Sequence, residues 1–177
     1  MKQQELFHTS KRAWHGGGKR LGRRKTARPL AARKWMHLTL KSARAVGAWS
    51  FLKPKNKKLV SHILNSRARS FGVEIKEWVN MGNHLHIKCR FQTRLGFQNF
   101  LRTVTALIAR KITGAKKGVK IGCFWQGLAF TRILKTRLEE LQLRHYFKAN
   151  RLESEHGVVA REQKLKEFLL WVRRLPS

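Results

Sequence analysis

The hydrophobic pattern of this chain switches repeatedly between alternation and helical spacing, and this switching is its strongest constraint on the fold. Residues 35–41 alternate, with Met36, Leu38 and Leu40 on one side, which is the period of a half-buried strand. Apolar residues then recur every three or four positions through residues 59–71, which is the spacing of an amphipathic helix. A strand followed by a helix therefore opens the pattern.

Alternation returns in two neighbouring segments. Residues 73–79 alternate, residues 80–83 have the composition of a turn, and residues 84–91 alternate strictly, so the two segments are expected to form a β-hairpin. A helical stripe follows over residues 95–112 and ends before Gly114. This second half repeats the strand-to-helix switch of the first.

The rest of the pattern completes one small fold. An apolar run over residues 128–134 predicts a fourth strand, residues 137–156 a third helix, and residues 161–174 a C-terminal helix. The order β-α-β-β-α-β-α predicts an α+β fold, a ferredoxin-like (split β-α-β) antiparallel sheet with helices on one face. The other face of the sheet is then left to carry a site.

Charge indicates what kind of partner such a sheet would have. The 177 residues include 40 Lys and Arg against 9 acids, a formal net charge of +31, and this predicts a polyanion, with nucleic acid as the first candidate. All nine acids are Glu. The absence of Asp argues against the usual two-metal nucleases, Asp-Asp-Glu transposases, Walker-type ATPases and Ser-His-Asp hydrolases. A nuclease built from this chain needs another chemistry.

Charge also divides the chain into three parts. Residues 1–34 hold eleven Lys or Arg against one Glu, and we expect a basic, extended arm that orders on phosphates. Residues 35–157 form the folded domain, and residues 158–177 a C-terminal helix.

Apolar runs are too short for a membrane span and the first residues lack a signal peptide's apolar stretch, which predicts a cytoplasmic, nucleoid-associated protein.

Two histidines on the strand at residues 84–91 are candidate metal ligands. Strand alternation places His84 and His86 on one face, together with Lys88 and Arg90, and sends the apolar residues between them to the core. Two imidazoles at positions i and i+2 of a rigid strand can converge on one divalent cation. The alternative is a pair of partly exposed surface histidines.

The only tyrosine of the chain is the second candidate. Tyr146 lies in the predicted helix 137–156, and residues four apart share a helix face, so Gln142, Tyr146 and Asn150 form a polar stripe. A phenol flanked by amide oxygens that can ligate a cation would suit catalysis. The alternative is a ring packed in the core with its hydroxyl at the rim.

Taken together, these features resemble one family. Three motifs stand in order, each in the predicted context: His84-Leu85-His86 after a Gly-Asn turn, Phe124-Trp125-Gln126 before a strand, and Tyr146-x-x-x-Asn150 on the following helix. The ordered set resembles the REP-associated tyrosine transposases, which are single-tyrosine HUH transposases of the insertion-sequence type, over roughly residues 35–157. One departure is visible: the family often continues Tyr-Ile-x-x-Asn-Pro, whereas Phe147 and Arg151 stand here.

The resemblance implies a reaction and its residues. Tyr146 would attack a phosphodiester of single-stranded DNA, leaving a 5′-phosphotyrosine and a free 3′-hydroxyl that allows rejoining. His84, His86 and Asn150, with Gln142 as the substitute for Asn150, would hold Mg²⁺ or Mn²⁺. The implied substrate is single-stranded or hairpin DNA, often a repeated palindrome. A homodimer would suit full transposition, and no membrane partner is expected.

Basic residues are predicted to contact DNA phosphates. They are Lys88, Arg90, Arg94, Arg102, Arg110, Lys111, Lys116, Lys117 and Lys120, with Arg23, Arg24 and Lys25 in the arm. The side chains of Trp35, Trp49 and Trp78 either pack in the core or stack on unpaired bases.

Two other functions stay open: a non-enzymatic nucleic-acid-binding protein, and a domesticated transposase that binds hairpins without cutting. Cys89 and Cys123 are expected to be reduced core thiols.

Overall fold

The computed structural model describes residues 14–16, 28–116, 118, 121–156, 166–167 and 170. Its elements are β1 (Trp14–His15), β2 (Met36–Lys41), a short 3-10 helix (Gly47–Trp49), α1 (Pro54–Ser70), β3 (Val73–Asn80), β4 (His84–Phe91), α2 (Arg94–Thr113), β5 (Phe130–Ile133) and α3 (Arg137–His156). These elements confirm the strands and helices expected between residues 35 and 156. The C-terminal helix expected at residues 161–174 lies outside the described residues.

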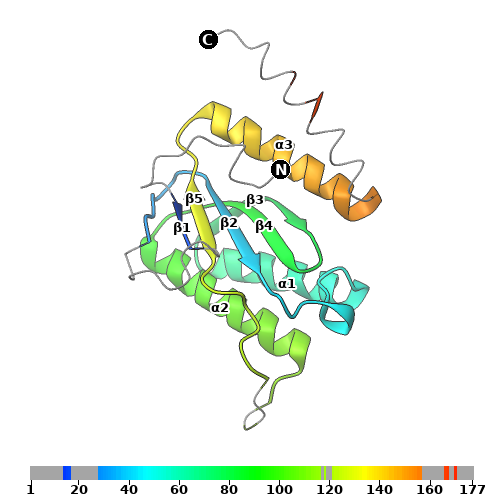
Figure 1. Cartoon of the computed structure of the whole chain (residues 1–177). Coiled ribbons are helices and arrows are strands. Elements are labelled where there is room, and N and C mark those ends of the chain that lie inside the picture. The colour runs from blue at the N-terminus through cyan, green and yellow to red at the C-terminus, as the bar shows by residue number, and fades with distance from the viewer. Residues whose placement is uncertain are drawn as a thin grey trace.

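One antiparallel sheet organises the fold, with strand order β1-β5-β2-β4-β3. The helices α1 and α2 form the expected layer on one face, and α3 lies across the opposite face (Figure 1). The β2–β4 register pairs Leu38 with Ile87 and Thr39 with His86. Neighbouring pairs therefore face opposite layers, which confirms the predicted α+β sheet and shows that its second face is covered as well.

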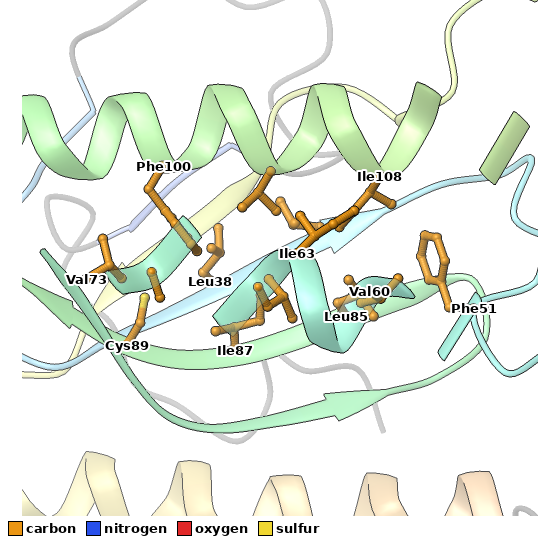
Figure 2. Packing of buried hydrophobic residues seen from close by; sticks show 14 of the residues in the cluster. Leu38, Phe51, Val60, Ile63, Val73, Leu85, Ile87, Cys89, Phe100 and Ile108 are labelled. Atoms are coloured by element: carbon orange, nitrogen blue, oxygen red, sulfur yellow. The ribbon is translucent and has the colours of Figure 1, made fainter. Parts of the chain in front are cut away.

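The main core lies between the sheet and the α1–α2 layer. Leu38, Leu85 and Ile87 from the strands, and Phe100 and Ile108 from α2, are completely buried there (Figure 2). Every second residue of β2 and β4 reaches this layer because side chains alternate across a strand. Burial of a large apolar side chain contributes about 1.5 to 3 kcal/mol, so this layer supplies most of the hydrophobic stabilisation of the sheet.

Helix ends follow the chemistry of the sequence. Pro54 opens α1, where its missing N–H costs no hydrogen bond, so the helix starts earlier than the apolar stripe alone indicated. The Thr93 hydroxyl accepts a hydrogen bond from the Gly96 N–H at 3.1 Å at the start of α2. At the other end, Gly114 has a φ of 68°, a left-handed conformation that glycine adopts without strain.

Part of the predicted arm belongs to the sheet. Trp14 and His15 form β1, paired with Arg132 and Thr131 of β5. The next residue, Gly16, has a φ of 82°, and a Cβ there would overlap the backbone carbonyl oxygen of Ala129. The glycine is thus required by this close approach. The basic cluster of the arm, residues 23–25, lies outside the described residues.

Candidate active site

The sheet face beneath α3 carries the predicted histidines. β4 supplies His84 and His86, and in the β2–β4 register they pair with Lys41 and Thr39. His84 is half-buried, whereas His86 is only 1% exposed. The expectation that both imidazoles lie on an open sheet face is therefore wrong for His86, because α3 packs over it.

His86 is held from two sides. Its Nδ1 lies 3.0 Å from His37 Nε2 and 3.2 Å from Thr39 Oγ1, both on β2. Its Nε2 lies 3.3 Å from the hydroxyl of Tyr146 on α3, with the two rings nearly perpendicular. The lone tyrosine and the second histidine of the predicted site are thus direct neighbours across the sheet–helix interface.

His84 lies beside this pair. Its ring centroid is 4.8 Å from that of His86, and its Nδ1 lies 2.6 Å from Asn83 Oδ1. An amide oxygen accepts hydrogen bonds, so this contact fixes the His84 tautomer that carries the proton on Nδ1. In the same tautomer His86 donates from Nδ1 to His37 or Thr39. In this tautomer the Nε2 atom of each ring has the lone pair that a metal ion would need.

His37 stays neutral in this network. Complete burial lowers the pKa of His37 to about 3, and the positive charge of Arg132 lowers it further in the same direction. Arg132 is itself nearly buried and donates to Glu139 at 2.7 Å. A neutral imidazole has one lone pair on its ring, so His37 can accept the Nδ1 proton of His86 in a hydrogen bond.

The three polar residues of the α3 stripe differ in burial. Tyr146 is 5% exposed and Asn150 is 2% exposed, while Gln142 is half-buried. The Asn150 Nδ2 atom is buried and has no hydrogen-bond partner among the described residues. His145, the residue before Tyr146 in α3, is half-buried. The buried part of the stripe, Tyr146 and Asn150, faces the sheet; the spacing predicted only that the three residues share one helix face.

Metal ligation at this site would need an amide. Among the described residues, no group of three or more His, Cys, Asp and Glu side chains has the geometry to hold an ion. The two imidazoles would therefore need Asn150 or Gln142 as the third protein ligand. A buried amide with an unpaired end suits that role, since the oxygen and nitrogen of an amide can exchange places by rotation.

Two of the predicted DNA-contacting cations form ion pairs with glutamates. Lys88 is buried, forms a 2.7 Å ion pair with Glu140 of α3, and lies over the Trp35 ring. Arg90 is exposed, pairs with Glu74 at 2.6 Å and also lies over Trp35. Lys88 thus attaches α3 to the sheet, which explains why it faces the same side as the histidines without reaching the surface.

The other predicted cations divide by position. Arg94, Arg102, Arg110, Lys111 and Lys116 are exposed on α2 and just after it. Lys117, Lys120, Arg23, Arg24 and Lys25 lie outside the described residues. The phosphate contacts assigned to these residues therefore stay predictions.

Hydrogen bonds hold the segment Phe124-Trp125-Gln126 against the sheet and α2. Trp125 Nε1 donates to the Thr105 carbonyl at 2.9 Å, and the Gln126 N–H donates to the Lys41 carbonyl at 2.7 Å. Ser42, directly after β2, donates to the Phe124 carbonyl at 2.5 Å. These contacts fix the connection between α2 and β5 against the end of β2.

His37 and Thr39 are the site residues that we did not predict from the sequence. Both occupy the polar side of the first predicted strand. Pairing residues 35–41 with residues 84–91 in the observed register would have placed Thr39 opposite His86. The signal was therefore present in the alternation, but the register that gives it meaning is a tertiary property.

Comparison with known proteins places the fold. No family model and no curated protein matches the sequence. Among solved structures, a REP-associated tyrosine transposase bound to a REP hairpin matches with a TM-score of 0.58 and 16% identity, over 76% of this chain and 75% of that one. A candidate transposase from Deinococcus radiodurans R1 matches with a TM-score of 0.44 and 15% identity, over 72% of this chain and 98% of that one. This chain therefore has the fold of a REP-associated tyrosine transposase.

Proposed function

We propose that this protein is a metal-dependent enzyme that nicks and rejoins single-stranded DNA at hairpins through a covalent 5′-phosphotyrosine. The observation that carries the proposal is the contact between the Tyr146 hydroxyl and His86 Nε2 at 3.3 Å, with His84 alongside. A nucleophile next to two imidazoles of one strand is the arrangement that tyrosine-dependent phosphoryl transfer needs. The transposase fold supports it independently.

The donor set favours a particular metal. His84, His86 and Asn150 would supply two imidazole nitrogens and one amide oxygen, and a substrate phosphate would add oxygen ligands. Imidazole binds Mn²⁺ more readily than Mg²⁺, whose sites are built from oxygen atoms. The metal would polarise the scissile phosphate when bound. We therefore expect activity with both ions and tighter binding of Mn²⁺.

The phenol supplies the chemistry of the transfer. Its oxygen forms a bond to phosphorus while the bond from phosphorus to O3′ breaks, and the lost phenolic proton balances the proton gained by the leaving oxygen. A tyrosine has an ordinary pKa of about 10, so the proton must be removed with help. In the tautomer of His86 that carries the proton on Nδ1, Nε2 would accept the hydrogen bond of the phenol, 3.3 Å away, and metal ligation would use the same lone pair. Ligation would thus release the hydroxyl from His86 toward the substrate.

Hairpin DNA is the substrate class that we assign. The solved relative in fold is bound to a REP hairpin, and this chain carries a formal net charge of +31. The exposed cations on α2 would contact backbone phosphates without reading bases. No helix in the described part of the chain is both long and apolar enough to cross a membrane.

A covalent-adduct assay tests the proposal. The protein is incubated with end-labelled hairpin DNA carrying single-stranded flanks, with and without Mn²⁺, and denatured in SDS. We expect a labelled protein band that needs Mn²⁺ and contains the 5′-phosphate fragment. Tyr146→Phe removes only the hydroxyl, so it should retain DNA affinity and lose the band completely. An adduct in this variant would refute the assigned chemistry. So would a wild-type adduct joined through a 3′-phosphate to the fragment upstream of the cut.

A metal titration tests the ligand set separately. Mn²⁺ binding to the full chain is followed by the electron-spin-resonance signal of free Mn²⁺. His84→Ala should weaken binding strongly and leave the fold unchanged, because the side chain is only half-buried. Asn150→Ala should have a milder effect if Gln142 replaces it. Identical Mn²⁺ binding in wild type and the His84 variant would remove the metal from the proposal. If wild type binds the hairpin but forms no adduct with it, the protein is instead a hairpin binder that does not cut DNA.

A further inference from the structure

A groove runs beside α1 on the side of the sheet away from Tyr146. It is bounded by the helix and by Trp78 of the edge strand β3, and it encloses about 900 Å³. Trp78 pairs in register with Ile87 of the main core, so its side chain belongs to the face that α1 and α2 cover. We call this hollow, lined by Lys57, Lys58, Ser61, Asn65, Arg69 and Trp78, the α1 groove.

The helical wall of the groove is one continuous polar stripe. Lys57, Ser61, Asn65 and Arg69 follow one another at intervals of four, and residues at that spacing share a helix face. The stripe spans about 18 Å at 1.5 Å of rise per residue. Asn65 and the cations at both ends are exposed. The wall can therefore follow an extended strand along several phosphates.

Charge in the groove has one sign. Lys57, Lys58 and Arg69 take part in none of the salt bridges found among the described residues. The two acids of the neighbouring strand β3 are already engaged, since Glu74 pairs with Arg90 and Glu77 with Arg151 of α3. The three cations are thus available to an anionic ligand, and the nearby acids are compensated elsewhere.

The opposite wall is aromatic. Trp78 is half-buried against the core and lines the groove. Cations that follow a backbone, combined with an aromatic ring on which a base can stack, are the elements of a single-strand binding surface. A duplex presents its phosphates but keeps its bases stacked on one another. The aromatic wall therefore favours an unpaired strand.

We propose that the α1 groove binds the single-stranded DNA that flanks the hairpin, with phosphates on Lys57, Lys58 and Arg69 and one base on Trp78. The assignment of a hairpin flank rests on the proposed function. The groove makes the protein a two-site DNA binder, because it lies on the opposite face of the sheet from the histidines and the tyrosine. A strand held there has to pass around an edge of the sheet to reach the phenol.

Fluorescence anisotropy on the full chain tests this proposal. The probes are a blunt hairpin, the same hairpin with an unpaired thymidine extension of about ten nucleotides, within the range covered by single-strand binding folds, and the free thymidine strand. The groove variant is Lys57→Gln/Lys58→Gln/Arg69→Gln. The control is Arg137→Gln/Arg144→Gln/Lys148→Gln, which removes three exposed positive charges from α3.

The proposal predicts a selective loss. The groove variant should bind the extended hairpin and the thymidine strand about tenfold more weakly, with the slope of log affinity against log salt lower by about 2, since each single-strand phosphate contributes about 0.7. Its affinity for the blunt hairpin should stay within about twofold of wild type. The control should affect all three probes alike. Equal weakening of all probes by the groove variant, or an extension that adds no affinity to wild type, would overturn the proposal.

Two further measurements separate the groove from the nuclease and from misfolding. Trp78→Phe keeps an aromatic face and should retain most of the affinity for the thymidine strand that Trp78→Leu loses, with circular dichroism showing both folded. Equal affinities of these two variants would remove the stacking role. If wild type forms no adduct while the groove variant still loses thymidine binding, the proposed function fails and the groove stands. If wild type forms the adduct normally and the groove variant binds the thymidine strand as wild type does, the groove proposal fails and the proposed function stands.

Discussion

Leu85 and His86 are neighbours on β4, both almost completely buried, and they lie on opposite faces of the same sheet. The face of Leu85 packs on apolar side chains of α1 and α2. The face of His86 holds imidazoles, hydroxyls and an ion pair beneath α3. One strand thus builds two layers with different properties. The apolar layer supplies stability, while the polar layer supplies reactive groups in fixed positions.

The buried imidazole of His86 in the polar layer is stabilised by its hydrogen-bond partners. Burying a polar group without a hydrogen bond costs about 1 to 3 kcal/mol in proteins. The Nδ1 of His86 has two partners on β2, and its Nε2 has Tyr146. A small apolar cluster that includes Val79, Leu143 and Phe147 packs beside them. We therefore expect α3 to depend on polar contacts more than α1 and α2 do.

The largest expected effect breaks the apolar layer. Phe100 is completely buried against the sheet, so Phe100→Ala should lower the free energy of unfolding by about 3 to 5 kcal/mol, through lost burial and the cavity left behind. Guanidinium denaturation followed by circular dichroism measures the change. A loss below about 1 kcal/mol would mean that this layer does not carry the stability of the fold.

The next effect is specific to the polar layer and depends on pH. His37 has a pKa of about 3 in the folded chain and an ordinary value near 6.5 when unfolded. Between pH 3 and pH 6.5 the unfolded state binds more protons than the folded state. The free energy of unfolding is therefore highest above pH 6.5, as far as His37 is concerned, and decreases as the pH falls below that value. Between pH 6.5 and 5 the loss should be about 2 kcal/mol, at 1.36 kcal/mol per pH unit.

The matched variant for this pH effect is His37→Gln, which can hydrogen-bond but cannot be protonated. Unfolding curves in EDTA at pH 5, 6 and 7 should show a flatter dependence for the variant than for wild type. The same slope in both proteins would assign the pH dependence to other groups.

A smaller effect tests how α3 is attached. Glu140→Gln leaves the buried Lys88 without its carboxylate, and because Glu140 is partly exposed to water we expect a loss of about 1 kcal/mol. The control is Glu74→Gln, which breaks the exposed pair with Arg90 and should change stability by less than about 0.5 kcal/mol. Equal losses in the two variants would mean that Lys88 does not anchor the helix.

The smallest effect concerns the two thiols and leaves stability unchanged. Cys89 is completely buried, and burial raises its pKa to about 12, so its reactive thiolate is absent at neutral pH. Cys123 is exposed, which corrects the expectation of a core thiol there. A thiol reagent such as Ellman's reagent should modify Cys123 in the folded chain and Cys89 only after denaturation. Rapid reaction of both would show that the apolar layer opens readily.

Sequence periodicity was sufficient to predict the helices and strands between residues 35 and 156, but it could not predict the contacts between them. The strand at residues 84–91 and the helix at residues 137–156 were predictable because alternation and helical spacing are local properties. The burial of His86 depends on where α3 docks, and the role of Lys88 depends on an acid in a distant helix. An unpaired lysine and a buried ion-paired lysine look the same in a sequence. The residues of the candidate site could therefore be named, but not the network that holds them.

The strand β1 has a consequence for the order in which the chain acquires its structure. Trp14 and His15 pair with Arg132 and Thr131, so this contact closes a long loop that contains β2, β3, β4, α1 and α2. Closing a long loop costs entropy that only later contacts compensate. The β3–β4 hairpin can form early, whereas the outer edge of β5 stays open until the N-terminal segment returns. During synthesis β5 is the last strand to emerge, and its unpaired edge is then a site for association with other chains. Once Trp14 and His15 have paired with β5, this edge is covered and no longer open to other chains.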